Sequence, residues 1–305
     1  MIRALVRCKQ HGGPSKRPGP GKVLACVLGV ALLVTGCVSS SPSESPTTGA
    51  RAEGQAVLDW DTATVTLPLD RYGMAPRETL IVSAAAGIKA YQCQTGSTTL
   101  DSAMVTDTIA YLNGAPQVSH WLWGRWDAPY VAKFGLEGEQ TPPMGFGVIG
   151  MAQDDPCWRV IADAGLQMVT GFGVDPALSN LEASLVLASA GMNSYDQALT
   201  DPGYLSLQAR WSACITQAGY AIDPLSSLGI TKWDDTWSES QFLQAMVTEA
   251  QCADNMNYTQ QVADIFASYQ MKYIADHEAE LVAIKQLADE TVARATKVLT
   301  DAGVL

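Results

Sequence analysis

The chain has 305 residues, 47% of them apolar, and a formal net charge of −12. A chain of this length and composition can bury one large core or two modest ones. Its acidic balance is the opposite of what a nucleic-acid-binding protein needs, because phosphate contacts supply most of the affinity for nucleic acid. We therefore expect no nucleic-acid partner.

The first 36 residues have the layout of an export signal. Six basic residues and no acidic residue occupy positions 1–22, and an apolar run follows at 23–34. This run is shorter than the roughly 20 residues that a membrane-spanning helix needs. The sequence predicts that residues 1–36 are removed on export.

The apolar run ends in Val34-Thr35-Gly36-Cys37, which resembles the bacterial lipobox. The resemblance implies cleavage before Cys37 and lipidation of its sulfur; an uncleaved anchor and a plain signal peptide are the alternatives. Two acyl chains are enough for stable membrane attachment. We therefore expect a protein that is lipid-anchored at Cys37 on the extracytoplasmic face of the cell membrane.

A Ser/Pro/Thr-rich stretch follows at 37–55 and is typical of a flexible tether. Once 1–36 are removed, 13 basic residues face 31 acidic ones, a net charge of −18. The globular part is expected at 56–305. We divide it into a loop- and Trp-rich subdomain at 56–175 and a helical subdomain at 176–305.

The first subdomain has few regular elements. Residues 57–67 are rich in β-branched side chains and predict a strand or an extended arm. Pro76 opens a helical pattern that ends at Gly96, and 101–112 form a weaker one. Residues 113–175 are punctuated by Gly and Pro and show no clear period, so that we expect loops there.

The second subdomain is predicted to be helical throughout. Helical patterns cover 176–191 and 204–219, and a capping-box pattern at Ser238 opens a further one at 239–255. From 258 to about 300, apolar residues recur every three or four positions. This indicates one long amphipathic helix, or two with a break near His277, and the fold class is mainly α.

Four cysteines, Cys93, Cys157, Cys214 and Cys252, lie beyond Cys37. An even number in an oxidising compartment predicts two disulfides, and four cysteines allow three connectivities. Closely spaced pairs such as C-x2-C, which structural metal sites use, do not occur. We therefore expect disulfides and no metal.

One stretch carries a resemblance to a known family. Trp211-Ser-Ala-Cys214 runs on to Gly219-Tyr220, and Glu249-Ala-Gln-Cys252 precedes the long helix. This pattern is similar to the C-terminal half of secreted actinobacterial lipoproteins of unassigned function, with Ile215 and residues 249–251 as departures. The resemblance implies the pair Cys214–Cys252, which leaves Cys93–Cys157 as the second bond, and it implies no catalytic motif or cofactor.

Two motifs have the letters of a cofactor or metal site without the context. Residues 145–150, GFGVIG, match G-x-G-x-x-G, but two prolines precede them where a dinucleotide fold needs a strand. His277 has Asp276 and Glu280 beside it, yet it lies on the apolar stripe of the long helix, which favours a packed histidine over a metal ligand. We expect neither a cofactor nor a metal.

The segment 120–127 holds three tryptophans within six residues. It supplies five candidate residues for ligand or partner binding: Trp121, Trp123, Arg125, Trp126 and Asp127. Aromatic rings can stack on a sugar ring or a peptide, and the two charged residues would anchor polar groups. The alternative is that a loop-rich region builds its core from large aromatic rings.

A nucleophilic active site is not indicated. The sequence has no G-x-S-x-G elbow, and His120 is the one histidine in a region where a cleft is plausible. We predict a non-catalytic cell-envelope lipoprotein that binds a protein partner or a cell-wall component. The alternatives are a solute-binding lipoprotein of a transporter and a cell-wall hydrolase that uses His120 with nearby acids.

Overall fold

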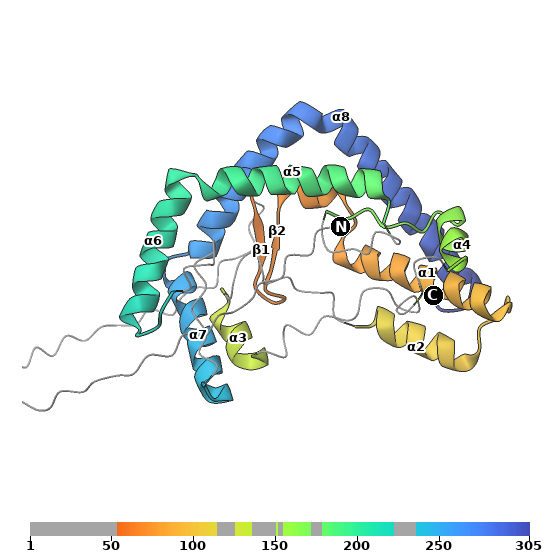
Figure 1. The fold of residues 1–305 in the computed structure, drawn as a ribbon, viewed down its shortest axis with the longest axis horizontal. Coiled ribbons are helices and arrows are strands. Elements are labelled where there is room, and N and C mark those ends of the chain that lie inside the picture. The colour runs from red at the N-terminus through yellow and green to blue at the C-terminus, as the bar shows by residue number, and fades with distance from the viewer. Residues whose placement is uncertain (1–53, 115–125, 136–150, 152–154, 172–178, 223–235) are drawn as a thin grey trace, which may run out of the picture. The chain divides into compact units, whose positions relative to one another are not determined.

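The computed structural model describes residues 54–114, 126–135, 151, 155–171, 179–222 and 236–305. All of them belong to the second of the two units into which the chain divides, after Thr47. The fold of this unit is mainly helical, as the sequence predicts (Figure 1). The described strands are β1 (Val57–Asp59) and β2 (Thr64–Thr66), an antiparallel hairpin in which Leu58 pairs with Val65.

A short 3-10 helix η1 (Pro68–Tyr72) leads from the hairpin to α1 (Pro76–Thr95). The carboxylate of Glu78 accepts a hydrogen bond from the Ala75 N–H at 2.8 Å, which satisfies one of the free donors at the start of α1. Gly96 ends α1 in the left-handed conformation, with a φ of 66°, as the sequence predicts. The helix α2 (Ser102–Leu112) follows, with Asp101 as its cap.

Two short helices lie in the region that was expected to be loops. They are α3 (Ala128–Phe134) and α4 (Cys157–Asp163). Each has seven residues, too few to show a helical period in the sequence. The expectation for 113–175 is therefore wrong at these two segments.

The remaining helices are α5 (Leu181–Leu199), α6 (Pro202–Gln217), α7 (Glu239–Asn255) and α8 (Tyr258–Asp301). The predicted capping box of α7 is confirmed: Ser238 N donates to Gln241 Oε1 at 2.8 Å, and Ser238 Oγ accepts from Gln241 N at 3.4 Å.

The predicted bounds of α5 are wrong, because the helix begins at Leu181 and continues through Gly191 to Leu199. A glycine inside a helix costs only about 1 kcal/mol. Burial of Ser194 and Ala198 beyond it continues the inward face. The helix stops where Asp201-Pro202 caps and opens α6.

The helix α8 is the scaffold of the fold, since α1, α5, α6, α7 and η1 all pack against it (Figure 1). It consists of two helical segments that meet at a kink at His277, where the backbone is not helical, with a φ of −130° and a ψ of 21°. The sequence left open one long helix or two with a break near His277, and the structure shows two segments joined across a kink at that residue.

Two hydrophobic clusters lie along α8. The aliphatic cluster joins α1, α4, the start of α5 and the part of α8 from Ile274 onward, and it is rich in Ala, Leu and Ile. The aromatic cluster joins the hairpin, α6, the end of α7 and the first half of α8; its large members include Trp126, Tyr204, Trp211, Tyr258 and Phe266. Each cluster draws residues from both sides of position 175.

Both predicted disulfides are confirmed. Cys93–Cys157 joins α1 to the start of α4, two helices that contribute to the aliphatic cluster, with Cα atoms 5.7 Å apart. Cys214–Cys252 joins α6 to α7 beside the aromatic cluster, with Cα atoms 5.9 Å apart. One covalent bond thus accompanies each cluster.

Polar side chains of α8 hold the N-terminal arm. Ala56 N donates to Asp264 Oδ1 at 3.3 Å, and Gln260 Nε2 donates to Ala56 O at 3.3 Å. Further on, Leu69 N donates to the buried Gln270 Oε1 at 3.0 Å. Buried backbone groups outside a ladder need such partners, so that α8 fixes the place where the expected tether joins the fold.

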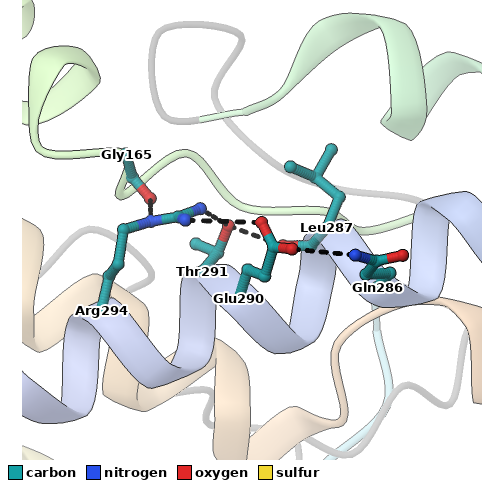
Figure 2. Close-up of polar contacts among 6 residues, drawn as sticks. All are labelled: Gly165, Gln286, Leu287, Glu290, Thr291 and Arg294. Atoms are coloured by element: carbon teal, nitrogen blue, oxygen red, sulfur yellow. Dashed lines mark hydrogen bonds and ion pairs between the residues drawn. The ribbon is translucent and has the colours of Figure 1, made fainter.

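Arg294 performs a similar role at the other end of α8 (Figure 2). Its Nε donates to the carbonyl of Gly165, just after α4, at 3.1 Å, and Nη2 donates to the buried Thr291 Oγ1 at 3.0 Å. Glu290 Oε2 lies 3.7 Å from Arg294 Nη1. Gly165 has a φ of 64°, which favours glycine, and a Cβ there would lie 2.6 Å from Arg294 Nε and would displace the guanidinium from the Gly165 carbonyl.

Candidate functional site

The predicted site residues are divided by the limits of the described structure. Cys37, Trp121, Trp123 and Arg125 lie outside the described residues, as do His120 and the GFGVIG segment. Trp126 and Asp127 lie inside them, at the entrance to α3. The site can therefore be built only from the described end of the Trp-rich segment.

Trp126 is a core residue. Its side chain is 1% exposed, and its ring meets the edge of Trp60, from the turn of the hairpin, at a centroid distance of 4.8 Å and an interplanar angle of 77°. Its indole Nε1 is buried and has no hydrogen-bond partner among the described residues. The alternative in which an aromatic ring of this segment builds the core therefore applies to Trp126.

Asp127 is buried as well, and it caps α3. Its Oδ1 accepts a hydrogen bond from Tyr130 N at 2.8 Å. A second carboxylate, Asp254 in the last turn of α7, accepts from Ala128 N at 3.3 Å through Oδ2. Two acidic side chains from distant parts of the chain thus meet at the first turn of α3.

The surroundings of these carboxylates favour their neutral forms. Burial raises the pKa of Asp254 to about 6, the hydrogen bond from Ala128 lowers it in part, and the charge of Asp127 adds to the rise. Burial also raises the pKa of Asp127, and the charge of Asp61 in the hairpin turn contributes. Among the described residues neither carboxylate forms an ion pair with a cation. The pair can therefore take up a proton under mildly acidic conditions.

The pair does not belong to a candidate metal site among the described residues. Within the described ranges, no group of three His, Cys, Asp or Glu residues is arranged to hold a metal ion. His277 stacks on Tyr273 with centroids 4.0 Å apart, and its Nδ1 lies 3.0 Å from the Tyr273 carbonyl oxygen. This histidine is packed at the kink of α8.

Two grooves lie beside α8. One, of about 390 Å³, is lined from α6 and α8 by Arg210, Ser206, Asp264 and neighbours. The other, of about 350 Å³, lies between α1, residues 98–100 and the end of α8, with Lys89 and Asp301 in its lining. Neither groove contains a histidine or a cysteine in its lining.

The sequence analysis missed the partner of Asp127. Asp254 follows Cys252 by two positions and precedes the break between α7 and α8. An acidic residue at a helix C-terminus is unfavourable for the helix dipole, and that mismatch is the signal that could have marked it. The contact with Ala128, 126 positions away, leaves no trace in local sequence.

Comparison with known proteins returns no match. No family model, no curated protein and no solved structure matches the chain. Across the described residues, no helix combines the length and the apolar character that crossing a bilayer requires.

Proposed function

We propose that the protein is a lipid-anchored component of the cell envelope, held on the extracytoplasmic face of the membrane by Cys37. The observation that carries the proposal is the order of features at the N-terminus. A basic segment, a 12-residue apolar run, Val34-Thr35-Gly36-Cys37 and a Ser/Pro/Thr-rich tether follow one another without interruption. Small residues before the cysteine suit a peptidase groove, and the thiol is the side chain there that can be alkylated.

We propose further that the anchored domain is a non-catalytic binding module for a protein partner or a cell-wall component. Support comes from the described surface, which offers two grooves and exposed apolar side chains for a binding partner. A solute-binding protein of the transporter type would have two lobes with sheets, whereas the described residues contain one two-stranded hairpin. The hydrolase alternative depends on His120, outside the described residues.

Fractionation of cells tests the anchor. Wild-type protein should sediment with the membrane and be released by detergent, and a Cys37→Ser variant should appear in the soluble fraction. Cys8→Ser, inside the segment expected to be removed, is the matched control and should leave the distribution unchanged. Soluble wild-type protein would contradict the proposal.

A further inference from the structure

The helix α5 has two apolar faces. Its inward face packs against α8 and η1 through Ala183, Leu187, Ala190, Ser194 and Ala198, all of which are buried. On the opposite side of the helix, Leu181 and Leu185 are each 55% exposed and Met192 is 42% exposed. A surface helix normally places polar residues there, so that the fold gives no reason for this outer row.

The spacing of the outer row is that of a helix-packing seam. Leu181, Leu185, Ala188 and Met192 are separated by four, three and four positions, which is the a/d spacing of a coiled coil. The row extends over about 16 Å, or three turns. It therefore matches the contact face of one short amphipathic helix.

The charges beside the row select the partner. Residues 183–195 carry no charge, and α5 has no Lys or Arg. Glu182, in the first turn of α5, and Asp196 lie on the same side of the row on the helix, and within the described structure neither forms a hydrogen bond or an ion pair through its side chain. The apolar row thus has one acidic edge that a basic partner would complement.

We propose that this outer face, Leu181, Leu185, Ala188 and Met192 with its acidic edge, is the docking surface for an amphipathic helix of a partner protein with Lys or Arg along one edge. The inference rests on the proposed function, because it names the partner-binding surface of the anchored module. A second copy of this chain fits less well. Antiparallel pairing brings Glu182 toward Asp196 of the other chain. In a parallel pair each acidic edge faces the uncharged edge of the other copy, so that neither pairing supplies a cation, because α5 has no Lys or Arg. An anionic lipid surface would repel the same edge.

A synthetic helical peptide of about four turns tests the surface, with Leu at the seam positions, Lys along one edge and a fluorescent label. Anisotropy is measured against the exported chain carrying Cys37→Ser, in which every described residue is unchanged. The peptide should bind, and the double variant Leu185→Ser/Met192→Ser should weaken binding about tenfold or more, because two buried apolar contacts are lost. A second double variant, Leu205→Ser/Val282→Ser, removes side chains of similar exposure, 49% and 53%, from α6 and α8 and should bind as the parent does.

A second peptide tests the acidic edge of the row. The same peptide with Glu in place of Lys should bind more weakly, and Glu182→Gln/Asp196→Asn should remove this preference. Circular dichroism checks that each variant folds; if the serine pair lowers helicity, Leu181→Ser alone replaces it.

Equal binding by the parent and the row variants would overturn the proposal. So would a dimer of the parent that Leu185→Ser dissociates, or binding to phosphatidylcholine vesicles that the row variants lose. If the parent chain does not bind the peptide while wild-type protein still sediments with the membrane, the docking surface is refuted and the lipid anchor is not.

Discussion

The aliphatic and aromatic clusters use α8 in opposite ways. From Ile274 onward, α8 packs small side chains such as Ala288 and Ala295 against α1, where Ala84, Ala85 and Ala86 are fully buried. In its first half, α8 contributes Tyr258 and Phe266 to a core of large rings, and Gln260, Asp264 and Gln270 bind the N-terminal arm. One half is a close helix–helix contact, and the other is built around side chains that need polar partners.

Most of the incomplete polar contacts among the described residues lie in the aromatic region. Trp126 Nε1, Asp254 Oδ1 and Thr259 Oγ1 are buried there without a hydrogen-bond partner in the described structure, whereas Thr170 Oγ1 is such a group beside Val169 of the aliphatic cluster. Each such group costs about 1–3 kcal/mol. In the aliphatic region near α4, the Arg294 guanidinium instead donates a hydrogen bond to the Gly165 carbonyl. We therefore expect the aromatic region to be the more sensitive to pH and substitution of polar groups.

The largest expected effect separates the two regions by their disulfides. The chain-entropy relation gives about 4 kcal/mol for each bond, because the sequence separations, 64 and 38 residues, differ little on a logarithmic scale. Cys93→Ser/Cys157→Ser and Cys214→Ser/Cys252→Ser should each lower the free energy of unfolding by about this amount. Urea unfolding followed by tryptophan fluorescence, which reports on Trp126 and Trp211, measures both. A loss below about 1 kcal/mol in either variant would contradict the assigned bond.

The next effect tests whether Trp126 belongs to the core. Trp126→Ala should destabilise the fold by about 3 kcal/mol or more, since a fully buried ring leaves a cavity. The matched control is Trp60→Ala, whose ring contacts Trp126 but is 39% exposed; it should cost about 1 kcal/mol. Thermal melts compare the two. Equal effects would show that Trp126 is less buried than described.

A smaller effect concerns the buried amide of the aromatic half. Gln270→Leu leaves the Leu69 N–H without its acceptor and should cost about 1–3 kcal/mol. Gln286→Leu on the same helix is the control, because the exposed Gln286 contacts only Glu290 in the described structure. Hydrogen exchange should show faster exchange at Leu69 in Gln270→Leu alone. Unchanged protection of the Leu69 N–H would show that the Gln270 side chain does not hold this part of the N-terminal arm.

The smallest effect is the pH response of the acidic pair. The folded-state pKa of Asp254, about 6, lies above its ordinary value of 3.8. The charged form therefore destabilises the fold above pH 6, and this penalty is relieved as the pH falls from about 7 to about 4. Asp254→Asn keeps an acceptor for Ala128 N and should be more stable than wild type at pH 7, by up to about 1 kcal/mol after solvent screening.

The advantage of Asp254→Asn should disappear near pH 4, where the wild-type carboxyl is protonated. Paired melts at pH 7 and pH 4 provide the measurement. Asp289→Asn, on the exposed side of the second half of α8, is the control. If the stability advantage of Asp254→Asn over wild type grew as the pH falls, the pKa of Asp254 would be lowered and not raised, and this interpretation of the pair would be wrong.

Much of the fold follows from local patterns in the sequence. The long terminal helix, its break at His277, the cap at Ser238 and the end of α1 at Gly96 each depend on residues within one or two turns. The disulfide pairing came from the family resemblance, since four cysteines alone leave three pairings. Two predictions from local patterns were wrong. The end of α5 was predicted at Gly191, but its buried face continues through this glycine, and seven-residue helices such as α3 carry no detectable period.

The candidate site could not be predicted in the same way. Asp127 was named because of its neighbours in the sequence, but its chemistry is set by burial and by Asp254, which accepts a hydrogen bond from the adjacent Ala128 across 126 positions. Trp126 was named for the same reason, and the hairpin residue Trp60 covers it. Contacts of this range are fixed by how helices pack, and one sequence does not contain that information.

Mass spectrometry of the N-terminal tryptic peptide tests the central claim, the lipid anchor at Cys37, most directly. The cleavage sites for trypsin nearest to Cys37 follow Lys22 and Arg51. The account predicts that membrane-extracted protein yields a peptide of residues 37–51 that begins at Cys37 and carries the mass of a diacylglyceryl group. An unmodified peptide of residues 23–51, intact across Gly36 and Cys37, would contradict it.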